Sequence, residues 1–419
     1  MRRIRTVLVA LVILTGALFI ADMGFDMMTT RASAETIYVG GSGPGNYSTI
    51  QAGINDADPG DTIYVYAGTY NEGLYIDKTL TLLGEDKYTT IINATGKIYG
   101  ILIDNADYVN ISGFSVIGAN FYNIRLYPGN HSHIYDNILK NSGSIALGVN
   151  PGHENLIENN FIVDNPRGVL ISDHSSANIL KSNIINSSGG RAITIGDGAT
   201  ENLISHNTIS GYDTGIYNKE SENNRIEYNQ ISDGANGVKI FDQSSGLLLN
   251  NIISNNEIGV KVFDHASAMV VNCTIQNSNL YDLTVGDTFN PTADVTLINT
   301  SFNDNKVDIM DDTSGLTVQW YLDVNVVDKS DEPVSGIDIR IRDNPNGDFD
   351  EVFTTNSGGR VDLVTLTQYL QNRTSKVSYT PHNITAYNTT SLGYASPEVF
   401  MDTSKEITIK VFSDMDGDG

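Results

Sequence analysis

The chain has little cysteine, little tryptophan and few basic residues. Its 419 residues include a single cysteine, Cys273, and a single tryptophan, Trp320. One cysteine cannot form an intrachain disulfide, so burial and backbone hydrogen bonding must hold the fold together. Lys and Arg total 25 against 50 Asp and Glu, which gives a net charge of −25. Electrostatic repulsion therefore argues against nucleic acid and anionic membranes as partners.

Long hydrophobic runs are confined to the N-terminus. Basic residues precede an apolar stretch from Val7 to Ile20, and Ala32-Ser33-Ala34 follows as a small-residue cleavage pattern. We interpret residues 1–34 as a secretory signal peptide, with an uncleaved N-terminal anchor as the alternative. No later stretch is apolar enough to span a membrane. Sequons such as Asn110-Ile111-Ser112 fit an exported glycoprotein.

A near-repeat of 22 residues is the strongest internal signal. GVKIFDQ begins at Gly237 and GVKVFDH begins at Gly259, and related segments recur every 22 to 24 residues from Gly100 to Asp282. Each repeat contains short apolar alternations separated by turn residues, which indicates strands rather than helices. A fixed period of this length predicts a parallel coil of strands, in which each coil stacks on the next.

Asparagine recurs once per repeat in the pattern apolar-x-x-Asn-x-apolar. Equal residues of stacked coils lie about 4.8 Å apart, so buried amides can satisfy one another by hydrogen bonding. We predict that Cys273 is a further buried member of a ladder of such asparagines. The ladder asparagines are Asn137, Asn160, Asn183, Asn207, Asn229 and Asn251. The capping box Ser48-Thr49-Ile50-Gln51 predicts a short helix, ending near Asp58, that covers the open N-terminal end.

The run STIQAGINDADPGDTIYVYAGTYNEGLYIDKTLTLLGED from Ser48, together with the repeats, resembles the right-handed parallel β-helix superfamily of pectate lyases. Within it the chain is most similar to NosD-like exported proteins, over about Thr36 to Asp312. The resemblance implies an all-β fold, a right-handed single-stranded parallel β-helix with an N-terminal capping helix. It also implies carbohydrate binding or sugar hydrolysis. The catalytic motifs of polygalacturonases, pectin methylesterases and mannuronan epimerases are absent.

Aligned repeats place acidic residues in one column at the end of the first strand: Asp173, Asp197, Glu220, Asp242, Asp264 and Asp287. An outward column three positions earlier contains a tyrosine and two lysines. Together the two columns predict one outer patch, which comprises Tyr217, Glu220, Lys239, Asp242, Lys261, Asp264 and His265.

This patch has two interpretations. As a glycan-binding groove it offers a ring for stacking, lysines for uronic acids and carboxylates for hydroxyls or calcium. Carboxylates on adjacent coils also match the separation used by retaining glycosidases. The structural alternative is a turn in which Asp side chains accept backbone hydrogen bonds and lysines offset their repulsion.

Metal ligands are sparse. His131 and His133 are close in sequence, and the next coil brings His153 near them, so copper or zinc could bind there. Exposed turn residues are the alternative. Copper handling is what the resemblance to NosD implies.

The period disappears from Gly315, and strands that alternate with turns predict a small antiparallel β-sandwich. Its sequence resembles carboxypeptidase-regulatory-like modules. The expected organisation is a signal peptide (1–34), a β-helix domain (35–314), a β-sandwich (315–412) and an acidic tail (413–419). In the tail, Asp414, Asp416 and Asp418 alternate like the opening of a calcium loop whose distal Glu is missing. We expect a truncated calcium-binding repeat, with a flexible acidic tail as the alternative.

The sequence predicts an exported cell-envelope protein, located outside the cell, at its surface or in the periplasm. We expect it to bind polysaccharide or to serve as a surface-layer or adhesion component beside other envelope proteins, without a strong catalytic signature. The first alternative is a polysaccharide lyase or glycoside hydrolase that acts on the outer β-helix face. The second is a periplasmic copper-handling protein. Calcium is the cofactor that the residues favour, with copper or zinc at the histidines as the alternative.

Overall fold

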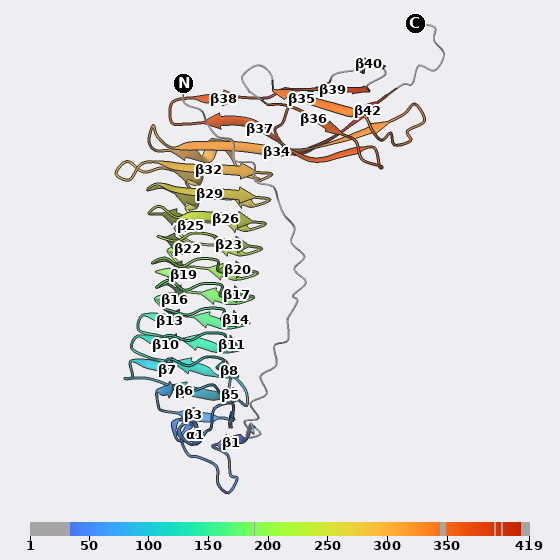
Figure 1. The fold of residues 1–419 in the computed structure, drawn as a ribbon. Helices are drawn as coiled ribbons and strands as arrows, with labels where there is room; N and C mark the ends of the chain where they lie inside the picture. Colours follow the sequence, from blue (N-terminus) through green and yellow to red (C-terminus); the bar gives the residue numbers. More distant parts are fainter. Residues whose placement is uncertain (1–33, 188, 344–348, 389–390, 395–396, 412–419) are drawn as a thin grey trace. The chain divides into compact units, whose positions relative to one another are not determined.

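The computed structural model describes residues 34–187, 189–343, 349–388, 391–394 and 397–411 (Figure 1). Nearly all of the expected signal peptide (1–34) lies outside these residues. The expected calcium ligands Asp414, Asp416 and Asp418 lie outside them as well.

Three parallel sheets, each receiving one strand per coil, wind the described part of the β-helix (Figure 1). Sheet A contains, in order, β1 (Thr36–Val39), β2 (Thr62–Val65), β5 (Thr81–Gly84), β8 (Asn110–Ser112), β11 (His133–Tyr135), β14 (Leu156–Glu158), β17 (Ile179–Lys181), β20 (Leu203–Ser205), β23 (Asn224–Glu227), β26 (Ser245–Leu249), β29 (Ala266–Val271), β32 (Ala293–Ile298) and β34 (Gly315–Val327).

Sheet B contains β3 (Gly68–Tyr70), β6 (Thr90–Asn93), β9 (Ser115–Ile117), β12 (Ile138–Lys140), β15 (Phe161–Val163), β18 (Ile184–Asn186), β21 (Thr208–Ser210), β24 (Gln230–Ser232), β27 (Ile252–Ser254) and β30 (Thr274–Gln276). Sheet C contains β4 (Leu74–Ile76), β7 (Tyr99–Ile103), β10 (Tyr122–Leu126), β13 (Ile145–Val149), β16 (Arg167–Ile171), β19 (Arg191–Ile195), β22 (Thr214–Lys219), β25 (Asn236–Phe241), β28 (Ile258–Val262), β31 (Tyr281–Val285) and β33 (Val307–Ile309). These sheets confirm the predicted β-helix.

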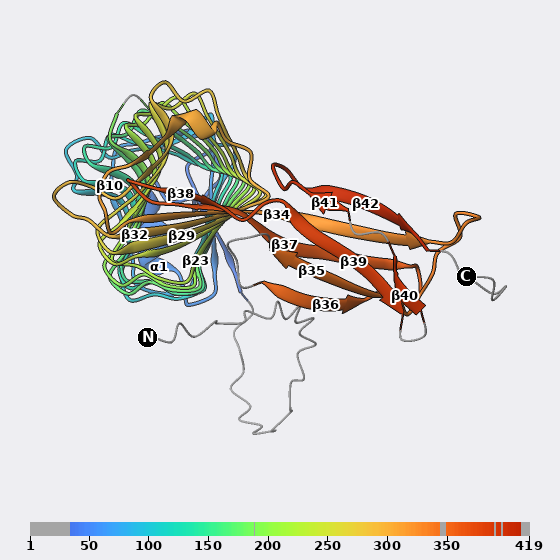
Figure 2. The same ribbon diagram turned by 90° about the horizontal axis from the view of Figure 1, so that it is seen from above.

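The interior of the β-helix is made of stacked aliphatic columns. Along sheet C, Val169 lies opposite Ile193, and the same column continues through the next coils. All of its members are at most 1% exposed: Val169, Ile193, Ile216, Val238, Val260 and Leu283. Burying one such side chain stabilises a fold by about 1.5–3 kcal/mol. Seen down the coil, the strands of successive coils superimpose (Figure 2).

Asparagine ladders fill two corners of the coil. In the column that the sequence predicts, each side-chain amide donates to the next asparagine along, and the column ends on Cys273 and Thr300. The structure adds a second ladder, which the sequence analysis missed: Asn155, Asn178, Asn202 and Asn224. The signal for it was present, because these asparagines recur at intervals of 23, 24 and 22 residues.

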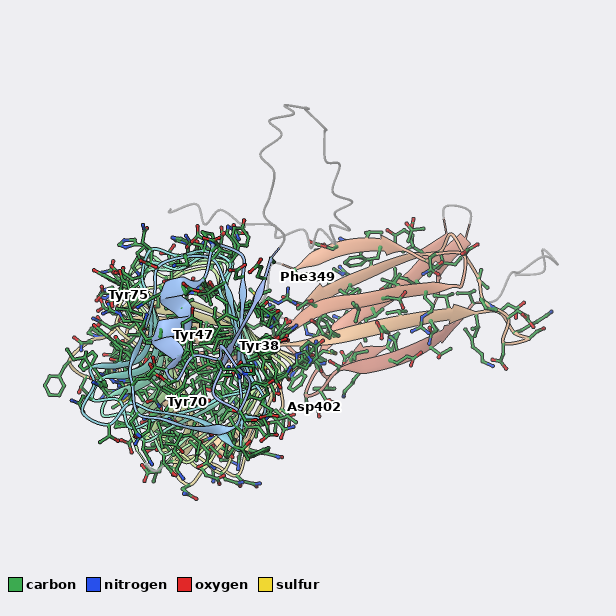
Figure 3. All side chains as sticks on the ribbon, turned by 90° about the horizontal axis from the view of Figure 1, so that it is seen from below. Tyr38, Tyr47, Tyr70, Tyr75, Phe349 and Asp402 are labelled. Carbon is green, nitrogen blue, oxygen red and sulfur yellow. The ribbon has the colours of Figure 1, made fainter. Side chains whose placement is uncertain are left out.

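Helix α1 (Ile50–Asp56) packs against β1, β2 and β4 at the N-terminal end of the coil and buries Ile50 and Ile54. Thr49 is its N-cap and accepts from the Ala52 N–H at 3.3 Å. The carboxylate of Glu72 accepts hydrogen bonds from the Ile50 and Gln51 N–H groups, at 2.8 and 3.0 Å. The helix ends two residues before the expected end at Asp58, because the backbone is already extended at Ala57. Figure 3 shows Tyr47 beside this helix, where its hydroxyl donates to Asp56.

The first strands of the C-terminal region continue sheet A. Strand β34 pairs with β32 in parallel through its first residues, Gly315–Gln319. It also pairs with β37 (Arg360–Gln371) in antiparallel fashion and with β42 (Lys405–Lys410) in parallel. Beyond β37 lies β38 (Lys376–Ser378), and the short helix η1 (Asp304–Lys306) precedes β33.

A separate C-terminal sheet has the order β36 (Asp350–Thr354), β35 (Asp338–Asp343), β39 (His382–Asn388) and β40 (Ser391–Tyr394), and β41 (Glu398–Val399) pairs with β39. Its pairings are antiparallel. Buried residues from both sheets, such as Ile339 and Leu322, belong to one hydrophobic cluster. This arrangement supports the predicted sandwich.

Candidate functional site

The outer face of sheet C brings a tyrosine and two lysines together. In the parallel register, Tyr217 of β22 lies opposite Lys239 of β25, which in turn lies opposite Lys261 of β28. Strands β19, β22 and β25 follow one another along the coil (Figure 1). Because strand residues alternate between faces, these three side chains point outward while Val238 and Val260 fill the interior.

The sequence analysis missed three other side chains on this face. The Arg191 guanidinium carbon lies 3.5 Å from the centroid of the Tyr217 ring. Phe241 and Phe263 stack with centroids 5.0 Å apart and an angle of 3° between their planes. Both phenylalanines occupy the same position of the repeats GVKIFDQ and GVKVFDH, which is the signal that could have found them. We name Arg191, Tyr217, Lys239, Phe241, Lys261 and Phe263 the basic-aromatic patch.

The aromatic rings of the patch are partly covered by its cations. Lys239 Nζ lies 5.2 Å from the centroids of both Phe241 and Phe263, and Lys261 Nζ lies 5.0 Å from that of Phe263. Although it lies on the outer face, Phe263 is only 7% exposed. Tyr217 meets Phe241 edge to face, with centroids 4.9 Å apart.

The two lysines differ in their electrostatic surroundings. Lys261 pairs with Asp287 at 3.4 Å. Among the residues that the structure describes, Lys239 has no acidic partner within ion-pair distance. Burial lowers the pKa of Lys239, and the positive charges of Lys261 and Arg191 lower it further. This face is therefore locally cationic on a protein whose net charge is −25.

The acidic members of the expected patch lie in the turn that follows these strands. Glu220, Asp242 and Asp264 all have left-handed backbones, with φ of 49°, 57° and 60°. Glu220 and Asp242 both pair with Lys219, and Asp264 lies 3.6 Å from the exposed His265. The hydrogen bond from Lys219 lowers the pKa of Glu220.

The six acidic residues of this column were expected to accept backbone hydrogen bonds if they serve the turn. Within the described chain, only the Asp287 carboxylate does so, from Phe289 N–H at 3.0 Å. The left-handed turn is present at five of the six positions: Asp173, Asp197, Glu220, Asp242 and Asp264. Beside Glu220 and Asp242 the surface is hollowed by a cavity of about 380 Å³.

A second basic-aromatic cluster lies farther toward the N-terminus in the same outward column. Arg125 aligns with Gly148, which aligns with Leu170, and the column continues to Tyr217 through Thr194. The guanidinium carbon of Arg125 lies 4.1 Å from the centroid of the Tyr127 ring. The pairing of arginine or lysine with aromatic rings thus recurs along sheet C.

The expected copper ligands do not converge. The ring nitrogens of His131, His133 and His153 lie 3.3, 2.9 and 2.8 Å from Glu154, Glu158 and Ser176, respectively. Cys273 is buried in the asparagine ladder, and burial raises the pKa of its thiol. No group of three or more His, Cys, Asp or Glu side chains among the described residues is placed to hold a metal ion. The residues that the structure describes therefore do not fit a copper centre.

Comparison with known proteins places the chain in a family and a fold. The family described as "Periplasmic copper-binding protein (NosD)" matches residues 54–243 and 200–330. A polygalacturonase from Erwinia carotovora ssp. carotovora is 14% identical with a TM-score of 0.50, over 69% of this chain and 97% of that chain. An alginate lyase from Paenibacillus sp. is 14% identical with a TM-score of 0.49, over 65% and 99%. At such identities the likeness is one of fold. The comparison with curated proteins returned no match.

The family match confirms the predicted likeness to NosD, and the match to the polygalacturonase agrees with the predicted β-helix fold. Across the described ranges, no helix has the length and apolar character needed to cross a bilayer.

Proposed function

This chain belongs to the NosD family, and on that premise we propose that it is an exported cell-envelope protein that binds polysaccharide through the basic-aromatic patch. The periplasmic description of the family supports export. The observation that carries the proposal is the alignment of Tyr217, Lys239 and Lys261 on consecutive coils, flanked by stacked phenylalanines. A surface-layer or adhesion component would use the same surface to hold the protein on a glycan.

The chemistry of the patch suits sugars. Aromatic rings provide flat apolar surfaces, and neighbouring charged groups provide hydrogen-bond donors for hydroxyl and acidic groups. The coil repeats this combination at about 4.8 Å per step, a spacing comparable to the length of one sugar residue. A linear polysaccharide that lies along the coil axis would therefore meet equivalent positions on successive coils.

The ionisation of the carboxylate of Glu220 favours binding over catalysis. A glycosidase requires one carboxylic acid that stays protonated near neutral pH. Glu220 instead pairs with Lys219, and its pKa is lowered. Its surroundings suit a fixed ion pair in a turn better than a general acid.

The test is to incubate the protein with immobilised and soluble polysaccharides, both uronate-containing and neutral. We expect saturable binding to at least one polysaccharide without unsaturated or new reducing-end products. Product formation would support the alternative of a lyase or hydrolase. If no polysaccharide binds, the proposed function is wrong.

A further inference from the structure

Of the two lysines in the patch, Lys239 is the one without an ion-pair partner among the residues that the structure describes. It is half-buried, and among the described residues no carboxylate lies within ion-pair distance of it, whereas Lys261 pairs with Asp287. On the preceding coil, Lys219 pairs with both Glu220 and Asp242. Lys219 and Lys261 therefore each have a carboxylate at ion-pair distance, whereas among the described residues Lys239 has none and is influenced by Asp287 only as a more distant charge.

The neighbours of Lys239 add to the positive charge. The Arg191 guanidinium carbon and Lys239 Nζ both face the Tyr217 ring, at 3.5 and 5.8 Å from its centroid. Lys239 and Lys261 Nζ both face the Phe263 ring, at 5.2 and 5.0 Å. Three cations thus converge around shared rings. Taking a charge out of water is costly unless it is paired, and cation–π contact offsets only part of that cost.

We infer that Lys239, Lys261 and Arg191 form an anion subsite that selects acidic polysaccharides, whose sugars carry a carboxylate or a sulfate group. The inference rests on the proposed function and names the class of glycan that the patch takes. The acidic group would accept hydrogen bonds from Lys239 Nζ and supply the directly paired counter-charge that no described carboxylate provides. Charge-assisted hydrogen bonds of this kind are stronger than those between neutral groups.

The experiment compares matched acidic and neutral polymers on the wild-type protein and the Lys239→Met variant. Polygalacturonate is paired with its methyl-esterified form, and dextran sulfate is paired with dextran, so that the carboxylate and sulfate sources are tested separately. Lys140→Met is the control, because it removes the same charge from sheet B, where Lys140 pairs with Asp164 at 3.5 Å. Binding is measured by calorimetry, and the melting temperature of each variant is measured in parallel.

We expect the wild-type protein to prefer one acidic polymer over its neutral partner by about tenfold or more, with affinity falling as salt rises. Lys239→Met should remove most of that preference, and Lys140→Met should retain it. Because methionine relieves the burial of a charge, the melting temperature of Lys239→Met should equal or exceed that of the wild type.

Two results would overturn the inference. If acidic and neutral polymers bind equally well and Lys239→Met changes neither, the anion subsite is wrong while the proposed glycan binding stands. If no polymer binds the wild-type protein, both proposals are wrong. A large fall in melting temperature for Lys239→Met would instead assign Lys239 a structural cation–π role and would also contradict the inference.

Discussion

The side-chain amide of Asn183 donates to the side-chain oxygen of Asn207, one coil further along, at 3.0 Å. The same oxygen accepts from the backbone N–H of Asn183 at 3.0 Å. The Asn207 amide in turn donates to Leu180 O and to Asn229 Oδ1, at 2.9 and 3.0 Å. Each asparagine of the ladder therefore satisfies both its own polar atoms and buried backbone groups of its neighbours.

Replacing Asn207 by alanine should destabilise the fold by about 3 kcal/mol, because it removes the buried hydrogen bonds that Asn207 makes with the Asn183 backbone N–H and with Leu180 O. The measurement is the free energy of unfolding from urea titration. Asn186→Ala is the matched control, since Asn186 is exposed and its amide donates to Ser210 Oγ on the surface. That change should cost less than about 0.5 kcal/mol. Equal losses in the two variants would contradict a structural role for the ladder.

Replacing Tyr217 by alanine should lower the affinity for the bound polysaccharide by about fivefold, because an aromatic contact contributes on the order of 1 kcal/mol. The change also removes the ring that supports Arg191. Tyr228→Ala is the control, since Tyr228 is half exposed and stacks on His206 in a different part of the coil. If the control weakens binding as much as Tyr217→Ala, the glycan does not contact the patch.

Stability should fall in acid through Glu158 of β14. Burial by itself would raise the pKa of this carboxyl, but the hydrogen bonds with Lys181 and His133 outweigh burial and hold the pKa below its ordinary value of 4.5. A lowered folded-state pKa means that the contribution is present above about pH 4.5 and is lost as the pH falls through the folded-state value. Because the carboxylate is partly exposed, we expect less than about 1 kcal/mol.

The measurement is the melting temperature of the wild-type protein and of Glu158→Gln between pH 3 and pH 7. The wild type should be more stable near neutrality, and the difference between the two proteins should shrink toward pH 3. A difference that is constant with pH would show that the pair with Lys181 and His133 does not contribute through its charge.

Copper provides a test of the family description. Because His131, His133 and their neighbours do not form a group of ligands, titration of the untagged protein with copper should give the same result for the wild type and for the double variant His131→Ala, His133→Ala. Calorimetry or competition with a chelating dye measures this. If the wild type binds copper stoichiometrically and the double variant does not, these histidines do form a copper site. That result would contradict the conclusion that the described residues do not fit a copper centre.

The sequence by itself determined the coil, its asparagine column and its outward lysines. Parallel stacking forces equal positions of the repeats into register, so a period of 22 to 24 residues together with strand alternation fixes both the fold and the outward face of Tyr217, Lys239 and Lys261. The N-cap at Thr49 was also readable, because capping depends on a few adjacent residues. The second asparagine ladder could have been predicted in the same way, because its members also recur at the period of the repeat.

Only the tertiary structure decided how the side chains of the patch meet. Arg191 precedes its repeat motif, and the period drifts between coils, so its contact with Tyr217 could not be read from spacing. Glu72 caps α1 from a strand-connecting segment 22 residues away. In the described chain Lys261 has a carboxylate at ion-pair distance and Lys239 does not, although both occupy the same position of the repeat. The physical reason is that register fixes the position and face of a residue, whereas rotamers and turn lengths determine which atoms come into contact.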